Sequence, residues 1–261
     1  MLTEDLPVAA GPLAVVSLGA PLGDVPLHFI WAHGWGHDHR AFLPLASAFE
    51  RQGSQSLIEF PGFGQAPPPP TAWTTADYAD ATAAWLAGLP RMRRIWIGHS
   101  FGCRVGLQLA ARHPDAVDAM FLIAAAGLQR ARSPLEQVSL KARIAAYKSL
   151  KLLGRLGVDT AAMRNRFGSA DYRSAGPMRG VLVNAVREDL SDVARQVRCP
   201  VELVYGENDT ETPPEMGERF ARFIPGATLT ILPRFDHITI LTAGLHQVQN
   251  QLATFAARVQ S

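Results

Sequence analysis

A serine with glycines on both sides constrains this chain more than any other feature. The GHSFG segment at residues 98–102 follows an apolar run at 94–97 and opens a helical stretch at 101–112. A strand that turns sharply into a helix at such a serine is typical of a nucleophile elbow, where bulkier flanking residues would collide with the neighbouring strand and helix. The turn raises the hydroxyl of Ser100 above the sheet, and it leaves the backbone N–H of Phe101 facing the same space. The alternative is a serine that only caps a helix.

Short apolar runs alternate with longer helical patterns along the rest of the chain. The expected strands cover residues 15–18, 27–31, 56–60, 94–97, 117–123, 201–205 and 228–232. The expected helices cover residues 41–51, 75–89, 101–112, 214–223 and 244–258. This alternation predicts an α/β fold in which helices cover both faces of a mainly parallel sheet. Ligands bind beyond the carboxyl ends of the strands in such a sheet.

One block interrupts the alternation. Residues 128–197 contain no convincing strand and are read as several helices, which predicts a helical cap over the sheet. The core is then formed by residues 1–127 and 198–261, with the cap as an insert within one domain. A length of 261 residues fits a single α/β domain.

Charge is distributed unevenly between these parts. Residues 128–198 contain fourteen Lys and Arg against six Asp and Glu, whereas the remainder contains eleven against seventeen. A basic insert on an acidic body can be a docking surface for an anionic partner, or it can be a solvated helical face. The net charge of +2 is too small to indicate a nucleic-acid partner.

The cellular compartment is expected from three observations. The chain contains only two cysteines, which fits a reducing compartment. Glu4 and Asp5 stand where a signal peptide requires positive charge. No apolar run approaches the roughly 18 residues that a membrane span needs. The expected location is therefore cytoplasmic, without a membrane span.

A serine hydroxyl needs a base and an acid to become a good nucleophile. The loop after the expected strand at 201–205 supplies the candidate acid, Asp209, whose short side chain can orient an imidazole. Glu207 and Glu211 in the same loop are the alternatives.

The candidate base is His237, in the loop after the last expected strand. It gives the chain order serine, aspartate, histidine, with Ser100 first. The neighbouring Asp236 is expected to shape the loop, since adjacent residues rarely direct their side chains at each other.

A glycine-rich turn, HGWG at residues 33–36, follows the expected strand at 27–31. Its backbone can direct the N–H of Trp35 toward Ser100. Together with the N–H of Phe101, this donor would form an oxyanion hole, and each such donor contributes roughly 3–4 kcal/mol to transition-state stabilisation. The indole of Trp35 can also form a wall of the pocket.

A metal site is the competing interpretation of this region, because His33, His37, Asp38 and His39 lie within seven residues. Zinc hydrolases of the metallo-β-lactamase type require His-x-His-x-Asp-His, and here Trp35 occupies the position of a ligand histidine. The sequence contains no second cluster to supply the remaining ligands, so no metal is expected.

These residues together resemble the α/β-hydrolase superfamily over essentially the whole chain. The matching motifs are HGWG at 33–36, PGFG at 61–64, GHSFG at 98–102, GENDTETPP at 206–214 and FDH at 235–237. The resemblance implies an eight-stranded, mostly parallel sheet with a helical cap after strand six, and a two-step acyl-enzyme mechanism without a cofactor. HGWG with GHS is similar to the carboxylesterase branch that contains the pimeloyl-carrier-protein methyl esterases. In that branch a basic cap can receive an acidic carrier protein.

Two residues depart from patterns of the superfamily. Cys103 stands where many members have a second glycine, and Ile238 stands where carbon–carbon bond hydrolases often have tryptophan. The leading hypothesis is hydrolysis of a small carboxylic ester. The alternatives are hydrolysis of a carbon–carbon bond in a vinylogous diketone and a ligand-binding receptor with low turnover. Thioesterases, lactonases, amidases and peracid-forming relatives share the same motifs.

The acyl pocket is expected between the cap and the sheet. Its candidate residues are Trp35, Phe101, Leu128, Tyr147 and Met178, each of which could instead be an ordinary core residue.

Overall fold

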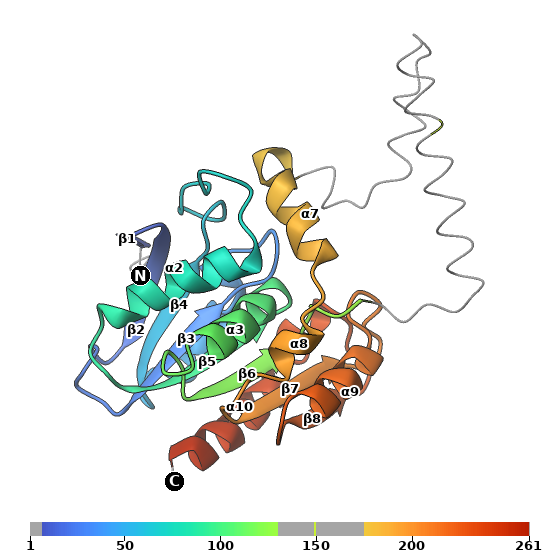
Figure 1. Ribbon diagram of the computed structural model, residues 1–261. Coiled ribbons are helices and arrows are strands. Elements are labelled where there is room, and N and C mark those ends of the chain that lie inside the picture. Colours follow the sequence, from blue (N-terminus) through green and yellow to red (C-terminus); the bar gives the residue numbers. More distant parts are fainter. Residues whose placement is uncertain (1–6, 130–148, 150–174, 261) are drawn as a thin grey trace.

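An eight-stranded sheet forms the centre of the computed structural model, which describes residues 7–129, 149 and 175–260 (Figure 1). The strands are β1 (Val8–Ala10), β2 (Leu13–Gly19), β3 (Leu27–Ala32), β4 (Ser54–Glu59), β5 (Arg93–His99), β6 (Ala119–Ile123), β7 (Val201–Gly206) and β8 (Thr228–Leu232). Their order in the sheet is β1-β2-β4-β3-β5-β6-β7-β8. The pairs β1–β2 and β2–β4 are antiparallel, and all other pairs are parallel. The expected fold, an α/β hydrolase fold with a mostly parallel sheet, is confirmed.

The central strands are buried on both faces, and their side chains alternate between two cores. In β5, Trp96 packs on one side of the sheet, whereas Ile95 and Ile97 pack on the other. This two-residue alternation explains why the strand contains an uninterrupted apolar run, as strands covered on both faces do.

Helices cover both faces of the sheet. The described helices are α1 (Leu43–Ser47), α2 (Thr75–Ala87), α3 (Phe101–Arg112), α7 (Arg179–Arg187), α8 (Ser191–Ala194), α9 (Pro214–Phe223) and α10 (Leu245–Gln260). Residues of α2, α3, α8 and α9 share the core that contains Trp96, and α2 and α3 lie side by side over this face (Figure 1). Residues of α1 and α10 pack on the opposite face.

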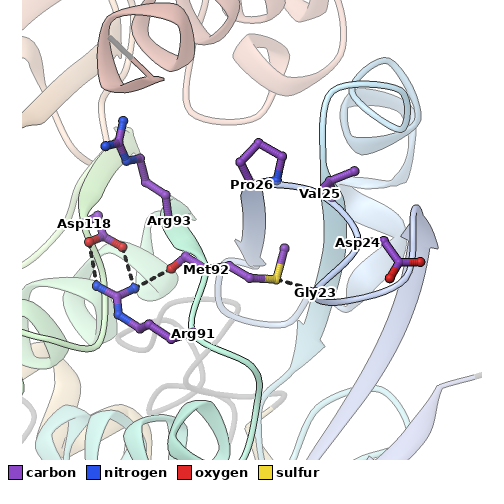
Figure 2. A pocket seen from close by; sticks show the side chains of 8 residues that line it. All are labelled: Gly23, Asp24, Val25, Pro26, Arg91, Met92, Arg93 and Asp118. Carbon is purple, nitrogen blue, oxygen red and sulfur yellow. Dashed lines mark hydrogen bonds and ion pairs between the residues drawn. The ribbon is translucent and has the colours of Figure 1, made fainter.

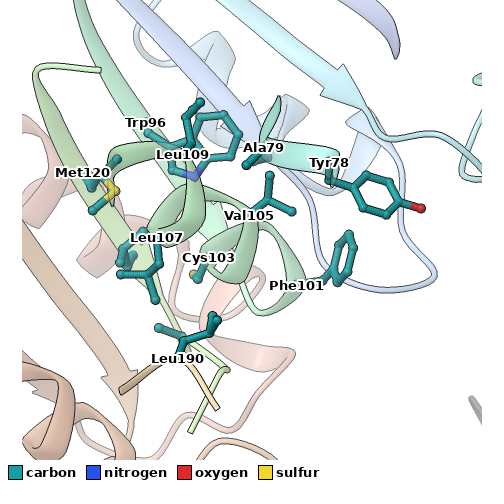
Figure 3. Close-up of a cluster of buried hydrophobic side chains, with 14 of the residues drawn as sticks. Tyr78, Ala79, Trp96, Phe101, Cys103, Val105, Leu107, Leu109, Met120 and Leu190 are labelled. Atoms are coloured by element: carbon teal, nitrogen blue, oxygen red, sulfur yellow. The ribbon is translucent and has the colours of Figure 1, made fainter. Parts of the chain in front are cut away.

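The helix that follows Ser100 is embedded in the first of these cores. Figure 3 shows Val105 of α3 beside Tyr78 and Ala79 of α2, with Phe101 at the start of the helix. Every residue of α3 from Val105 to Ala110 is buried. The packing therefore fixes the position of the turn that carries Ser100.

The structure contains one strand that the sequence did not predict, and one predicted helix is shorter than expected. The strand β1 was not predicted, because three residues are too few to display an alternating pattern. The helix predicted over residues 41–51 is only Leu43–Ser47, preceded by a short 3-10 turn at His39–Ala41. Pro44 lies in the first turn of α1 because it lacks the N–H that a position inside a helix would need.

The block at residues 128–197 is described only in part. Its described residues contain α7 and α8, and no strand. Leu190, directly before α8, donates its N–H to the carbonyl of Gly127 at 2.7 Å, so that this part of the block lies beside its start. The division into core and cap stays a prediction. In the described ranges, no helix is both long and apolar enough to span a membrane.

Candidate active site

Ser100 lies between the end of β5 and the start of α3, with a backbone φ of 48° and ψ of −101°. This conformation is uncommon for a residue with a side chain and is found where the surrounding structure imposes it. The N–H of Ser100 donates to the carbonyl of Ile123 at 3.1 Å, and its carbonyl accepts from Cys103 at 3.1 Å. The expected sharp turn from strand to helix is confirmed.

Gly102 explains why the turn needs small residues. A Cβ atom at this position would lie 2.0 Å from the carbonyl oxygen of Ala32, and one at Gly98 would lie 2.9 Å from the N atom of Cys103. Both obstacles are backbone atoms. Helix α3 therefore approaches β3 and β5 more closely than any residue with a side chain would permit.

We expect Gly102→Ala to lower the free energy of unfolding by about 3 kcal/mol, because the backbone of β3 would have to move. Gly88→Ala is the matched control, since its Cβ would lie in ordinary contact, 3.5 Å from the carbonyl oxygen of Trp85. Urea denaturation followed by circular dichroism measures both changes. Equal midpoints for the two variants would contradict the close approach.

Asp209 and His237 are brought together by the loops that follow β7 and β8. Oδ2 of Asp209 lies 2.8 Å from Nδ1 of His237, and the Asp209 side chain is fully buried. Thr212 supports the pair: its N–H donates to Oδ1 of Asp209 and its hydroxyl donates to Oδ2, each at 2.8 Å. Glu211 also donates its N–H to Oδ1. The carboxylate is thus held in one orientation.

Each member of this pair shifts the pKa of the other in the direction that favours its charged form. Burial by itself raises the pKa of Asp209, but the hydrogen bond and charge of His237 and the bonds from Thr212 outweigh it and lower that pKa. Burial by itself lowers the pKa of His237, but Asp209, with the charges of Glu211 and Asp236, raises that pKa above its ordinary value of 6.5. Asp209 is consequently ionised at neutral pH.

His99, next to Ser100 in the chain, contacts His237, and this contact was not predicted from the sequence. Its Nε2–H donates to the carbonyl of His237 at 3.0 Å, and the two ring centroids are 4.8 Å apart. Burial lowers the pKa of His99 to about 3, so this ring stays neutral. Within the described residues, Oγ of Ser100 forms no hydrogen bond with Nε2 of His237. His99, the residue before Ser100, therefore connects the loop of His237 to the serine turn.

Neither of the alternative acids is paired with Nδ1 of His237. Glu207 accepts the N–H of Arg234 at 3.1 Å, and Oε2 of Glu211 lies 3.7 Å from Nε2 of His237, not from Nδ1. The carboxylate of Asp236 accepts the N–H groups of Ile238 and Thr239, which confirms that it shapes its loop.

The glycine-rich turn after β3 is held by His33. Its ring is buried, Nδ1–H donates to the carbonyl of Gly34 at 2.7 Å, and Nε2 accepts the N–H of Phe60 at 3.2 Å. Burial is the main cause that lowers the pKa of His33 to about 4. The neutral ring therefore satisfies both of its nitrogens and connects the turn to the end of β4.

Four of the five candidate pocket residues belong to, or pack against, one hydrophobic core cluster. Trp35 contacts Phe101 edge to face, with ring centroids 5.6 Å apart. Phe101, Leu128 and Met178 are all buried in the core cluster against which Trp35 packs. Tyr147 lies outside the described residues.

Asp38, His39 and Glu59 place three ligand-type atoms within 4.8 Å of one another. Each side chain already has a protein partner in the described structure. Nδ1 of His39 lies 2.6 Å from Oε1 of Glu59, Gln65 donates its N–H to Oε2 of Glu59 at 2.6 Å, and Asp38 pairs with Arg40. Glu59 was not predicted as part of this group.

A surface pocket lies at the opposite ends of the strands from Ser100 (Figure 2). Pro26 and Arg93 stand at the starts of β3 and β5, whereas Ser100 follows the end of β5. Arg91 in this pocket is paired with Asp118 at 2.7 Å. The pocket is therefore separated from Ser100 by the length of the strands.

Comparisons with known proteins agree with the fold. The family model of the α/β hydrolase fold matches residues 28–156. A pimeloyl-[acyl-carrier protein] methyl ester esterase of Neisseria meningitidis is 30% identical over 225 residues, which cover 80% of this chain and 86% of that protein. A 2-(acetamidomethylene)succinate hydrolase of Mesorhizobium japonicum is 27% identical over 82% of each chain.

Solved structures share the fold. The enol-lactonase of Burkholderia xenovorans superposes with a TM-score of 0.72 at 20% identity, covering 97% of this chain and 100% of that one. On the sequence and structural matches together, the chain belongs to the α/β-hydrolase family and is a carboxylesterase-like member of it.

Proposed function

We propose that this protein hydrolyses carboxylic esters through an acyl-enzyme intermediate, with Ser100 as nucleophile, His237 as general base and Asp209 as the acid that orients it. The observation that carries the proposal is the buried 2.8 Å contact between Asp209 and His237, beside a serine on a strained strand-to-helix turn. A serine, a base within its reach and a group that orients the base form the arrangement that activates a hydroxyl.

The reaction follows from this arrangement. Oγ of Ser100 attacks the acyl carbon while Nε2 of His237 takes its proton. The N–H groups of Phe101 and Trp35 hold the oxyanion. Nε2–H then protonates the leaving alkoxide, and the neutral imidazole next takes a proton from a water molecule that attacks the acyl-enzyme. Collapse of the second intermediate releases the acid and returns the proton to Ser100.

The acyl group is proposed to lie against Trp35, Phe101, Leu128 and Met178, beneath a cap formed by residues 128–197. The edge-to-face contact of Trp35 with Phe101, and the membership of Leu128 and Met178 in the same core cluster, support this site. Tyr147 is retained as a candidate from the sequence. The cytoplasmic location also stays a prediction.

A carrier-bound methyl ester is the finer proposal for the substrate. The relatives named pimeloyl-[acyl-carrier protein] methyl ester esterase support it, as does the excess of Lys and Arg in residues 128–198, which suits an acidic carrier protein. A methyl ester on an acyl carrier protein should then be hydrolysed with a higher kcat/KM than the same acyl methyl ester free in solution, and added salt should reduce the difference.

The direct test is turnover of p-nitrophenyl esters from acetate to decanoate, combined with labelling by a fluorophosphonate. Trypsin releases residues 95–104 as a peptide that contains Ser100 as its single serine. We expect turnover, and the label on this peptide. A folded protein that neither hydrolyses the series nor carries the label at residues 95–104 would contradict the proposal. Bleaching of a vinylogous diketone without ester turnover would favour the carbon–carbon alternative.

The pH dependence of kcat/KM should report the ionisation of His237 in the free enzyme. The base acts only when neutral, and Asp209 holds its pKa above 6.5 despite burial. Activity is therefore expected to fall as the pH drops through a value above 6.5. Initial rates on p-nitrophenyl acetate measure this inflection. An inflection clearly below 6.5 would show that the base is not in this environment.

A further inference from the structure

Two carboxylates flank the ring of His237, one at each nitrogen. Asp209 contacts Nδ1 at 2.8 Å, and Oε2 of Glu211 lies 3.7 Å from Nε2. The N–H of Glu211 donates a hydrogen bond to Oδ1 of Asp209 at 2.8 Å, which fixes the backbone of Glu211 beside the ring. The Asp209 side chain is 0% exposed and that of Glu211 is 65% exposed. Glu211 therefore faces the solvent side of the site.

Nε2 is the nitrogen that matters for the leaving group. In the proposed mechanism it donates the proton that the leaving alkoxide accepts, at a distance of about 3 Å. An oxygen so placed lies within about 7 Å of Oε2 of Glu211, since the two distances can add to no more than that. The carboxylate is thus within reach of the substituent on the leaving oxygen.

The other groups around the ring do not neutralise this charge. Asp209 and Asp236 are anionic, and His99, which packs on the ring from the end of β5, is neutral because burial lowers its pKa to about 3. Among the described residues, the ion-pair partner of Glu211 is His237 itself. When that ring is neutral, as catalysis requires, the charge of Glu211 acts on the substituent of the leaving group beside it.

We propose that Glu211 selects the charge of the leaving group, favouring esters of cationic alcohols over those of neutral and anionic alcohols. The inference rests on the proposed function, in which Nε2 protonates the leaving oxygen. Glu211 is thus a specificity-determining residue. It does not exchange a proton with the substrate.

The test compares two esters of equal shape, butyrylcholine and 3,3-dimethylbutyl butyrate, by titration of the acid released. In Glu211→Gln, the ratio of kcat/KM for the cationic over the neutral ester should fall about two- to fivefold, the range for an exposed charge pair. Added salt should lower the same ratio in the unaltered protein but not in Glu211→Gln. Glu207→Gln, a solvent-exposed carboxylate of the same loop, is the matched control and should keep the original ratio.

A second readout separates electrostatics from structure. Glu211 contributes to the raised pKa of His237, so Glu211→Gln should also move the acidic inflection of kcat/KM to lower pH. A ratio and an inflection that are both unchanged in Glu211→Gln would overturn the inference and leave the proposed function intact. Failure of the unaltered protein to hydrolyse either of these esters or the p-nitrophenyl series would instead overturn the proposed function, and this inference with it.

Discussion

Replacing Ser100 with alanine is expected to lower kcat for p-nitrophenyl esters by about five to six orders of magnitude, the loss seen when a nucleophile that acts as one unit with its base is removed. Alanine keeps the Cβ atom, so the turn with its φ of 48° stays as it is. Stopped assays at high enzyme concentration measure the residual rate.

Ser47→Ala is the control for this substitution. Ser47 is an exposed residue of α1, on the face of the sheet opposite α3, and its variant should keep full activity. Both variants should unfold at the same urea concentration as the unaltered protein. If folded Ser100→Ala retained more than a few per cent of the turnover, another residue would be the nucleophile.

Replacing Asp209 with asparagine is expected to lower kcat by about 10⁴-fold. The carboxylate now accepts hydrogen bonds from Nδ1 of His237 and from Thr212. An amide directed at Nδ1 can offer its NH₂ group, which favours the tautomer that carries the proton on Nε2. That tautomer cannot take the proton of Ser100.

Glu207→Gln distinguishes this effect from a general loss of charge near the site. Glu207 accepts the N–H of Arg234, and a glutamine oxygen can accept the same bond, whereas the carboxylates paired with the ring in the described structure are Asp209 and Glu211. Its kcat should change less than about threefold, since substitutions at exposed positions are usually small in effect. A larger loss of kcat in Glu207→Gln than in Asp209→Asn would show that Asp209 is not the acid that orients His237.

Much of the fold was predictable because it is encoded locally. The apolar runs of β5, β6 and β7 are buried on both faces of the sheet, and such runs are visible without any knowledge of their neighbours. The strand β1 and the true length of α1 were not predictable in this way. A three-residue strand is stabilised by its pairing with β2, and the end of α1 depends on the turn that leads into β4.

The candidate site also has features that are local in the sequence and features that depend on tertiary packing. The serine turn, the acid after β7 and the histidine after β8 follow from the sequence, because glycine spacing and strand ends are local features. The position of His99 against the carbonyl of His237 is a contact across 138 residues, so only the packing of β5 against the last loop decides it.

By itself the sequence determined the turn at Ser100, since the small residues at 98 and 102 permit a close approach that larger residues would prevent. It left three acids in one loop as candidates for the partner of His237. The tertiary structure decided between them: it buries Asp209 against Nδ1 and leaves Glu211 exposed beside Nε2. The physical reason is that the three carboxylates have nearly the same chemistry. Their burial and their distances from the nitrogens of His237 distinguish them, and the fold sets both.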